Sequence, residues 1–410
     1  MSEAEATAPG DFVSTFFSPA FALDPYPAYR QLHAGPARFR VPGTKLVIAA
    51  GYDDCQALLR DRRLGHGFRE RMTAQFGEDV FDRHPAYRSL AHSILLMDPP
   101  DHRRIRGLAA KAFDARRTEA MRTRVRALAH ELVDGFEARG EGDLVSLFNF
   151  PLPVIVICEM LGIPEADRHR FTGGDRVAGR IIDPTPMSPE ELADADARVE
   201  ENHAYFRDLL AERRRSPRDD LLTALVQAET EDGVLGPDEL IANVSLLFAA
   251  GHETTVNLLG NGLLALHRSP EQLAALRAEP GLLASAVEEM LRYDSSVQLS
   301  GRTALEDFTF EDLEIRRGDQ VLTLLGAANH DPTVFTDPER FDVRRNEARP
   351  LSFGGGIHFC LGAQLTRIEA QEALGVLLER LPRLQLTELE APPRKATITL
   401  RGLQRLDARW

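Results

Sequence analysis

The longest helical pattern in the sequence covers residues 237–267, just before Ser269 and Pro270. It opens with Pro237 and two acidic residues, which is typical of a helix N-terminus because the first turn tolerates proline and favours negative charge. About 31 residues at ~1.5 Å each give a helix of roughly 46 Å, long enough to cross a whole domain. Most of its faces are apolar, so we expect this helix to be buried.

A polar cluster, AAGHETT, interrupts this apolar pattern at residues 249–255. Buried Glu253 and Thr254 are costly unless they have hydrogen-bond partners, and Gly251 weakens the helix at the same place. A threonine hydroxyl can also bond to the carbonyl four residues earlier and bend the helix. We therefore expect an opened turn beside a cavity. The cluster is either a satisfied polar patch at a kink or a proton relay, in which an acid and an alcohol deliver protons to a bound molecule.

The loop LSFGGGIHFCLG, residues 351–362, places a cysteine at the start of a predicted helix over residues 361–381. Its glycines allow the backbone to approach a large flat ligand closely. At a helix N-terminus, free N–H groups and the dipole favour the Cys360 thiolate, which is a soft metal ligand. His358 would point to the same side. The alternative is a partly buried, redox-silent cysteine, and zinc is not expected because paired ligand spacing is lacking.

An Arg-rich stretch at residues 102–126 follows the segment MDPPD. We expect Asp98 to cap a helix here and Pro99 to take its first position. His102 and Arg106 are four residues apart and share one helix face, where they could bind an anionic group of a ligand. The basic stretch is either a solvated surface or a docking surface for an acidic partner.

The composition argues against several classes of function. The 410 residues carry a net charge of −14, which argues against nucleic-acid binding because phosphate contacts need clustered cations. Three distant cysteines argue against a disulfide framework, and the acidic N-terminus lacks the features of a signal peptide. The most apolar run, residues 152–164, is too short to span a membrane. We therefore expect a cytoplasmic protein that binds neither membrane nor nucleic acid.

The remaining patterns indicate one α-rich α+β unit over residues 1–410. Residues 37–50 alternate on both sides of a Pro-Gly turn and predict a hairpin, whereas helical patterns dominate residues 51–293. Residues 308–325 predict short strands around turns, and residues 394–406 also have β character. Because the strands are few and clustered, we expect a single, mainly helical domain.

Five motifs resemble those of the cytochrome P-450 family and occur in the family's order. HRRIR resembles its haem-clamping helix, AGHET its oxygen-activating helix motif, EEMLR its Glu-x-x-Arg pair and GRTA a second propionate-binding segment. FGGGIHFCLG resembles its cysteine loop, F-x-x-G-x-H/R-x-C-x-G, which is highly specific. The resemblance covers essentially the whole chain. It implies a mainly α cytochrome P-450 fold with a long central helix and a small β-rich region.

The resemblance implies a role in haem binding for several residues. Cys360 matches the thiolate that ligates the haem iron and favours O–O cleavage by electron donation. Phe353 matches the aromatic residue beside that thiolate. The residues that match propionate-binding groups are His102, Arg106, Arg302 and His358. Glu289 and Arg292 match a structural pair, joined by an arginine that precedes the cysteine loop.

The long helix matches the family's oxygen-binding site at four positions. Ala250 and Gly251 match small residues that leave room for O2 against the iron. Glu253 and Thr254 match the acid–alcohol pair that steers protons to O2. Outside this helix, Ser296 stands where relatives often have proline, which could change the local geometry near the substrate.

The resemblance implies a haem-thiolate monooxygenase that hydroxylates or epoxidises a mainly apolar organic substrate, as in natural-product biosynthesis. The cofactor would be haem b, and electrons from NAD(P)H would arrive through a ferredoxin and a ferredoxin reductase. We expect residues 103–126, with exposed groups near Cys360, to be the docking surface for the electron donor. The substrate could be free or tethered to a carrier protein, and we expect the enzyme to act as a monomer.

By analogy with the family, the substrate should contact its variable segments. These are residues 64–97, 171–189, 297–299 and 396–399, with Leu246 and Ala249 on the long helix. Residues 175–192 are proline-rich, and we expect them to form a mobile lid.

Other functions remain open from the sequence. A peroxide-driven peroxygenase or a non-oxidative haem-thiolate isomerase would not need an acid–alcohol pair, so Glu253 and Thr254 argue against both. A haem-based sensor, or a scaffold that only binds a carrier-bound substrate, is the non-enzymatic alternative. Turnover that depends on electron transfer would exclude the peroxygenase and the isomerase.

Overall fold

The computed structural model describes residues 9–113, 115–171, 178–232 and 235–410. The α-helices are α1 Pro9–Phe16, α2 Pro19–Leu23, α3 Tyr26–His33, α4 Tyr52–Leu58, α5 Phe68–Phe76, α6 Val80–Arg83, α7 Pro85–Ala91, α8 Asp101–Ala112, α9 Ala115–Asp134, α10 Pro151–Leu161, α11 Ala178–Ile181, α12 Pro189–Arg215, α13 Leu221–Asp232, α14 Pro237–Arg268, α15 Pro270–Ala278, α16 Leu283–Tyr293, α17 Leu325–Ala328 and α18 Ala363–Arg380. The strands are β1 Arg38–Arg40, β2 Leu46–Ala49, β3 Leu64–Gly65, β4 Glu141–Asp143, β5 Ser300–Ala304, β6 Phe308–Phe310, β7 Leu313–Ile315, β8 Gln320–Thr323, β9 Gln385–Leu386 and β10 Asp407–Arg409.

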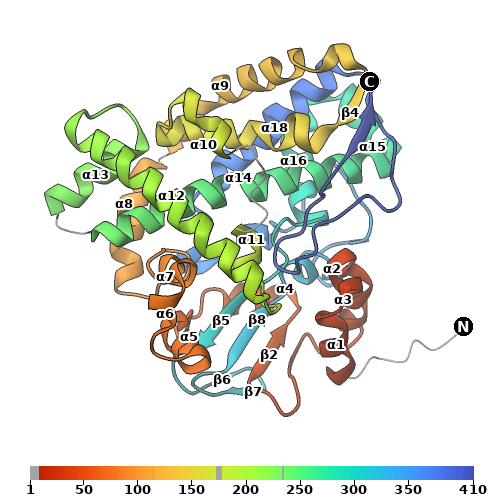
Figure 1. Cartoon of the computed structure of the whole chain (residues 1–410). Coiled ribbons are helices and arrows are strands. Elements are labelled where there is room, and N and C mark those ends of the chain that lie inside the picture. Colours follow the sequence, from red (N-terminus) through yellow and green to blue (C-terminus); the bar gives the residue numbers. More distant parts are fainter. Residues whose placement is uncertain (1–8, 114, 172–177, 233–234) are drawn as a thin grey trace, which may run out of the picture.

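Strands β2, β5, β6, β7 and β8 gather in one region with most of the helices on one side of it, whereas β4 lies at the other end of the molecule near the C-terminus (Figure 1). The largest sheet has five strands in the order β1-β2-β8-β5-β3. β1 and β2 pair antiparallel, which confirms the hairpin predicted at residues 37–50. The strands predicted within residues 308–325 are β6, β7 and β8, and β8 runs parallel to β2. This sheet therefore joins the N-terminal hairpin to a segment 274 residues later, since Leu46 pairs with Gln320.

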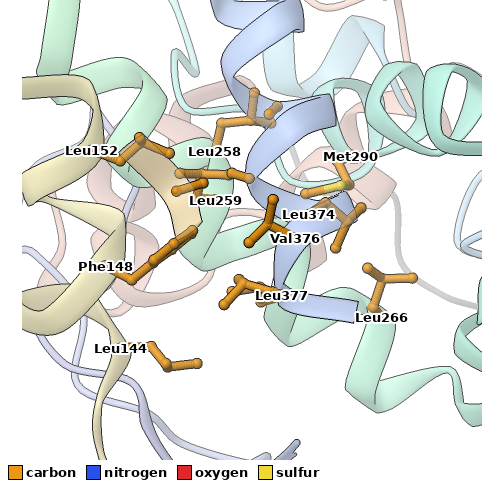
Figure 2. Packing of buried hydrophobic residues seen from close by; sticks show 14 of the residues in the cluster. Leu144, Phe148, Leu152, Leu258, Leu259, Leu266, Met290, Leu374, Val376 and Leu377 are labelled. Atoms are coloured by element: carbon orange, nitrogen blue, oxygen red, sulfur yellow. The ribbon is translucent and has the colours of Figure 1, made fainter. Parts of the chain in front are cut away.

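The long helix α14 confirms the central helix predicted from the sequence. It contacts α10, α12, α16 and α18, and it crosses the middle of the helical region (Figure 1). In its C-terminal half, Leu258, Leu259 and Leu266 pack with Leu374 and Leu377 of α18 in the largest apolar core (Figure 2). Each such side chain contributes roughly 1.5–3 kcal/mol when fully buried. This core fixes α14 relative to α18.

The predicted helix cap at Asp98 is wrong. Helix α8 begins at Asp101. The Asp98 carboxylate instead accepts hydrogen bonds from the backbone N–H groups of His66 at 2.7 Å and Gly67 at 2.8 Å. A loop more than 30 residues earlier in the chain thus takes the acceptor that local sequence assigns to the helix.

Two further expectations need correction. Helix α18 begins at Ala363, so Cys360 lies just before the helix and not in its first turn. Residues 394–406 contain two isolated bridges, to Val297 and within the segment, but no strand. Within the described ranges, no helix combines the length and apolarity needed to cross a membrane.

Candidate functional site

Away from its two ends, the buried helix α14 is accessible to solvent along one short side. Ala250 is exposed, and Leu246 and Thr254, about one turn before and after it, are partly exposed. Residues four apart lie on the same face of a helix, so these three side chains form a single stripe. The Thr254 hydroxyl donates to the Ala250 carbonyl at 3.4 Å, as expected. However, α14 is α-helical throughout, so the expected opened turn is wrong.

Gly251 has a packing role beside this stripe. A side-chain carbon added at Gly251 would lie 2.8 Å from Cδ1 of Ile157 in α10. That separation is too short for two carbon atoms, so the close packing of α10 on α14 requires a glycine here. Of the two small residues singled out by the family motif, Ala250 faces the accessible side and Gly251 sets the distance between two helices.

Two glycines in the cysteine loop are required by its backbone. Gly354 and Gly356 have φ angles of +67° and +64°, a region that side chains rarely tolerate. A side chain at Gly356 would also collide with the carbonyl oxygen of Leu59, at the end of α4. The glycines are thus explained by the turns of the loop and by its close approach to α4, and not only by a ligand.

Cys360 is partly buried at the end of this loop. Its N–H donates to the Phe353 carbonyl at 3.0 Å, which closes the loop. Burial raises the pKa of the Cys360 thiol, whereas the Gly362 N–H and the guanidinium groups of Arg106 and Arg367 act to lower it. The Arg367 guanidinium also lies over the Phe353 ring, 4.6 Å from its centroid. Positive charge and an N–H donor therefore surround the sulfur.

The segment after the loop is fastened to α14. Leu361 packs against the apolar cluster that includes Leu247 and Phe248 of α14. The Thr255 hydroxyl of α14 donates to Oε2 of Glu369 in α18 at 3.2 Å. Glu369 is buried, and burial raises its pKa well above the ordinary value. These contacts hold the cysteine loop and α14 in a fixed relation.

Three histidines from three distant segments meet beside the cysteine loop. The ring centroids of His102 and His358 are 4.2 Å apart, and those of His66 and His358 are 4.6 Å apart. Nε2 of each ring, and Nδ1 of His102, is buried with no hydrogen-bond partner among the described residues. Arg302 of β5 is also buried, and Arg106 of α8 donates to the Phe359 carbonyl of the loop. We call His66, His102, His358, Arg106 and Arg302 the cationic cluster.

Negative charge is scarce around the cationic cluster. Burial, and next the charge of Arg106, lower the pKa of His102 to about 4. Burial, and next Arg302, lower the pKa of His358 to about 3. Burial also lowers the pKa of Arg302 to about 10, against the opposing effect of Asp98. The two carboxylates of a haem would supply the missing acceptors and negative charge, so these residues fit that cofactor.

The sequence analysis missed His66. Its backbone is held at three points, because Asp98 accepts from the His66 and Gly67 N–H groups and Thr303 Oγ1 donates to the His66 carbonyl at 2.8 Å. Burial lowers the pKa of the His66 imidazole well below the ordinary value, and the charge of Arg302 adds to this effect. A histidine between two glycines was the sole sequence signal, and no regular spacing connects it to the other cluster residues.

Glu253 lies buried next to Thr254, at the edge of the accessible stripe. Its Oε1 atom is 3.4 Å from Nζ of Lys395, which comes from the C-terminal segment. Ser296 Oγ donates to the Thr254 carbonyl at 2.8 Å, a bond that proline could not form. The departure at Ser296 therefore adds a tie to α14 next to the acid–alcohol pair.

Glu289 and Arg292 form the expected structural pair. Both are buried in α16, with Nε–Oε2 and Nη2–Oε1 distances of 2.7 and 2.8 Å. Arg345 Nε, from the segment before the cysteine loop, lies 3.2 Å from Glu289 and is the predicted third member. Arg292 also donates to the Asn329 carbonyl at 2.9 Å. The pair thus fastens α16 to the segment that leads into the cysteine loop.

A separate pocket of about 610 Å³ lies where α5 and the segment before α8 approach the start of α14. Its lining includes Phe68, His92, Met97 and Asp238. The first three belong to the predicted substrate-contacting segment 64–97, so part of that segment borders a pocket. Of the other predicted segment, 171–189, residues 172–177 lie outside the described ranges.

Comparisons with known proteins agree with this description. The family model for Cytochrome P450 matches residues 181–400. The Cytochrome P450 monooxygenase PikC of Streptomyces venezuelae is 42% identical over 401 residues, covering 95% of this chain and 92% of that protein. The crystal structure of P450BioI in complex with hexadec-9Z-enoic acid ligated acyl carrier protein has a TM-score of 0.87 at 35% identity, covering 96% and 100% of the two chains. The tirandamycin C-bound P450 monooxygenase TamI has a TM-score of 0.85 at 38% identity, covering 96% and 99%. The expected fold, mainly α with a long central helix and a small β region, is confirmed.

Proposed function

From the premise that this chain belongs to the cytochrome P450 family of monooxygenases, we propose that it oxidises a mainly apolar organic substrate with O2. One oxygen atom enters the substrate by hydroxylation or epoxidation, and the other leaves as water after two electrons and two protons are supplied. The observation that carries the residue assignments is the cationic cluster, in which four buried imidazole nitrogens lack partners among the described residues. We propose that residues 1–410 act as one catalytic unit.

The cofactor of this proposal is haem b. Cys360 would ligate its iron as a thiolate, with Phe353 beside the sulfur, and the bound haem would supply O2 activation and O–O cleavage. The propionates would be bound by the cationic cluster, which consists of the four predicted residues and His66. Each charge-assisted hydrogen bond from an imidazolium or guanidinium to a carboxylate is stronger than a neutral one. The same contacts would place negative charge beside His102, His358 and Arg302, whose pKa values are lowered by burial.

The acid–alcohol pair would handle protons. Thr254 ends the accessible stripe of α14, so its hydroxyl can donate a hydrogen bond to a molecule bound against that stripe. The neighbouring carboxylate of Glu253 is buried beside Lys395, away from bulk water. We propose that protons pass from Glu253 to the Thr254 hydroxyl. Ala250, which is small and exposed, would leave the space for O2.

The substrate class follows from the apolar lining and from the relatives. Leu246, which belongs to the accessible stripe, and Ala249 beside it are partly exposed on α14. Two of the similar proteins are named for natural-product or acyl-carrier ligands, tirandamycin C for TamI and a carrier-ligated fatty acid for P450BioI. We propose an apolar natural-product intermediate, free or carrier-tethered, and an enzyme of secondary metabolism such as antibiotic biosynthesis. Its location in the cytoplasm and its monomeric state remain predictions from the sequence.

Electrons would come from NAD(P)H through a ferredoxin reductase and a ferredoxin. The docking surface proposed at residues 103–126 needs revision, because Arg122, Arg124 and Arg126 are ion-paired with carboxylates of α18 or α10. Residue 114 lies outside the described ranges. The cysteine loop itself exposes two large apolar side chains, Ile357 and Phe359, which could contact the electron donor.

Arg103, on α8, and Arg116, in the first turn of α9, are exposed basic residues. Arg103 lies on α8, whose Arg106 donates to the Phe359 carbonyl. We propose that both arginines guide an acidic ferredoxin onto Ile357 and Phe359. Arg116→Glu should slow reduction by ferredoxin at low salt, whereas Arg317→Glu, at an exposed arginine after β7 that belongs neither to residues 103–126 nor to the cysteine loop, should not. Equal rates in both variants would contradict this surface.

The reaction itself is tested with isotopes. A compound library is first screened for ligands that shift the spin state of the haem protein. A binding compound is then incubated with ferredoxin, its reductase, NADPH and ¹⁸O2, and the proposal requires one ¹⁸O atom in the product. Product formed with peroxide alone would favour a peroxygenase, and an unlabelled rearranged product would favour an isomerase. Binding without any turnover would favour a sensor or scaffold.

A further inference from the structure

Asp183 is a buried carboxylate in the proline-rich segment after α11. Its side chain is fully buried, and Arg180 Nη1 is 3.8 Å from Oδ1. Oδ1 accepts from the Thr185 N–H at 3.1 Å and from the Thr185 hydroxyl at 2.5 Å. Oδ2 accepts from the backbone N–H groups of Ile398 at 2.8 Å and Thr399 at 2.9 Å. One carboxylate therefore joins two segments more than 200 residues apart.

The lid side of this junction is internally braced. Arg180 donates to the Thr185 carbonyl at 2.9 Å, to the Thr185 hydroxyl at 2.7 Å and to the Pro186 carbonyl. Its Nε also lies 3.2 Å from Glu191 at the start of α12. Residues 180–191 are thus tied together around Arg180, so they can move as one piece when the contact with the C-terminal segment opens.

The C-terminal side is a turn that borders the site. The Thr397 hydroxyl donates to the Leu400 carbonyl at 2.6 Å, and Gln298 N–H donates to the Thr399 carbonyl at 2.9 Å. The turn is therefore fixed to the segment at residues 297–299. Asp183 supplies the contact on its other side, and thereby joins three of the segments that the sequence analysis expected around the substrate.

The same junction covers the acid of the proton relay. A side-chain carbon added at Gly179 would lie 2.7 Å from Glu253 Oε1 and 2.8 Å from Leu400 Cδ1, so α11 lies directly against both. Lys395, two residues before the turn, pairs with Glu253. Removing α11 from the C-terminal turn would uncover Glu253.

We propose that Asp183 is a positioning residue that latches residues 178–189 onto the turn at 397–400, closing the haem site over its substrate and covering Glu253. A carboxylate suits a reversible latch. Closed, it gains two hydrogen bonds from the Ile398 and Thr399 N–H groups; open, it regains water at the same oxygen, so the two states can be close in free energy. The identity of the closed site rests on the proposed function, but the latch itself rests on the hydrogen bonds of Asp183.

The first test is amide hydrogen exchange at Ile398 and Thr399, which requires neither substrate nor haem. Both carboxylate oxygens of Asp183 accept hydrogen bonds, whereas the NH2 group of asparagine can only donate. In Asp183→Asn the NH2 group must therefore face N–H donors at the turn or the donors of Thr185, so the latch weakens although the side chain keeps its size. Both amides should then exchange at least about tenfold faster than in the wild type. Asp194→Asn is the matched control, because Asp194 is exposed and pairs with Arg198 on its own helix. Unchanged exchange in folded Asp183→Asn would overturn the latch.

A milder variant protects the test against misfolding. Thr185→Val removes the hydroxyl donor and keeps the side-chain shape, so exchange at Ile398 and Thr399 should rise by less than in Asp183→Asn. No acceleration in Thr185→Val, together with a misfolded Asp183→Asn, would also overturn the latch.

The second test measures access to the haem with 4-phenylimidazole in stopped-flow mixing. Asp183→Asn should raise the association rate severalfold while the absorption spectrum of the haem protein is unchanged. Faster amide exchange with an unchanged association rate would mean that Asp183 only braces the turn, and the lid role would fail. A wild-type protein that binds no haem would defeat the proposed function, yet the exchange result would still decide the latch.

Discussion

Two buried groups of charged and polar side chains lie near the cysteine loop. The hydrogen-bonding atoms of one group are paired within the protein, whereas several nitrogens of the other have no partner among the described residues. In the Glu289–Arg292–Arg345 group, carboxylate and guanidinium atoms bond to one another and to backbone carbonyls. In the cationic cluster, four imidazole nitrogens lack a partner within the described part of the chain. Burial is similar for Arg292 and His102, at 1% exposure each, so burial does not distinguish them. The two groups differ in charge: the first contains the carboxylate of Glu289 with its arginines, whereas the cationic cluster contains no carboxylate. This difference separates a structural group from a ligand-binding group.

Breaking the structural group should have the largest effect. Arg292→Ala leaves the buried Glu289 carboxylate poorly compensated, so the free energy of unfolding should fall by about 3–5 kcal/mol, with or without haem. Urea unfolding followed by circular dichroism measures this. Arg198→Ala, at an exposed pair on α12, should cost less than about 1 kcal/mol. A loss as small in Arg292→Ala would remove the distinction between the two groups.

Acid should destabilise the haem-free protein through the cationic cluster. The pKa of His102 is lowered to about 4 in the folded state from an ordinary 6.5, so the unfolded chain binds more protons between these values. Stability should therefore fall as the pH falls from about 6.5 to 4, by roughly 2–3 kcal/mol from this residue. Urea unfolding at several pH values measures the slope, and His102→Leu should flatten it. An equal slope in the variant would show that His102 does not stay neutral in the fold.

Removing a member of the cationic cluster should weaken haem binding and spare the fold. His102→Leu deletes a buried imidazole with no partner among the described residues, so the haem-free protein should be no less stable. Loss of one charge-assisted bond to a propionate should raise the haem dissociation rate by about 10- to 100-fold. Transfer of haem to apomyoglobin measures this rate. A large loss of stability without faster haem loss would mean that His102 is structural.

His66→Ala should have a smaller effect of the same kind. Its ring contacts His358 and its Nε2 has no described partner, but only one of its ring nitrogens is buried without a partner, against two in His102. Haem dissociation should accelerate roughly 2- to 10-fold. His203→Ala, on α12 away from the cluster, is the control. Equal rates in the two variants would exclude His66 from the haem site.

The sequence predicted the features that depend on local spacing. The length of α14, the hairpin at residues 37–50, the partners His102 and Arg106 on one helix face and the pair Glu289–Arg292 follow from periodicities or short motifs. Such patterns need only the geometry of one element, which the neighbouring residues determine.

Features that depend on contacts between distant segments were missed or wrong. Asp98 precedes helix α8 as a capping residue would, but its carboxylate accepts a hydrogen bond from the backbone N–H of His66. This contact holds His66 where its ring packs against His358 of the cationic cluster. Lys395 reaches Glu253 from the far end of the chain, and Asp183 reaches the turn at 397–400. No spacing rule encodes these contacts, because loops bring the partners together.

The central claim is that Cys360 ligates a haem iron as a thiolate, and the ferrous–carbon monoxide difference spectrum tests it most directly. The wild type and a Cys55→Ser control should show a strongly red-shifted Soret band, because thiolate ligation produces that shift and Cys55 is buried at α4. Cys360→Ser should lack the band. A Soret band at the position typical of imidazole ligation in the wild type, or a red-shifted band that persists in Cys360→Ser, would contradict the account.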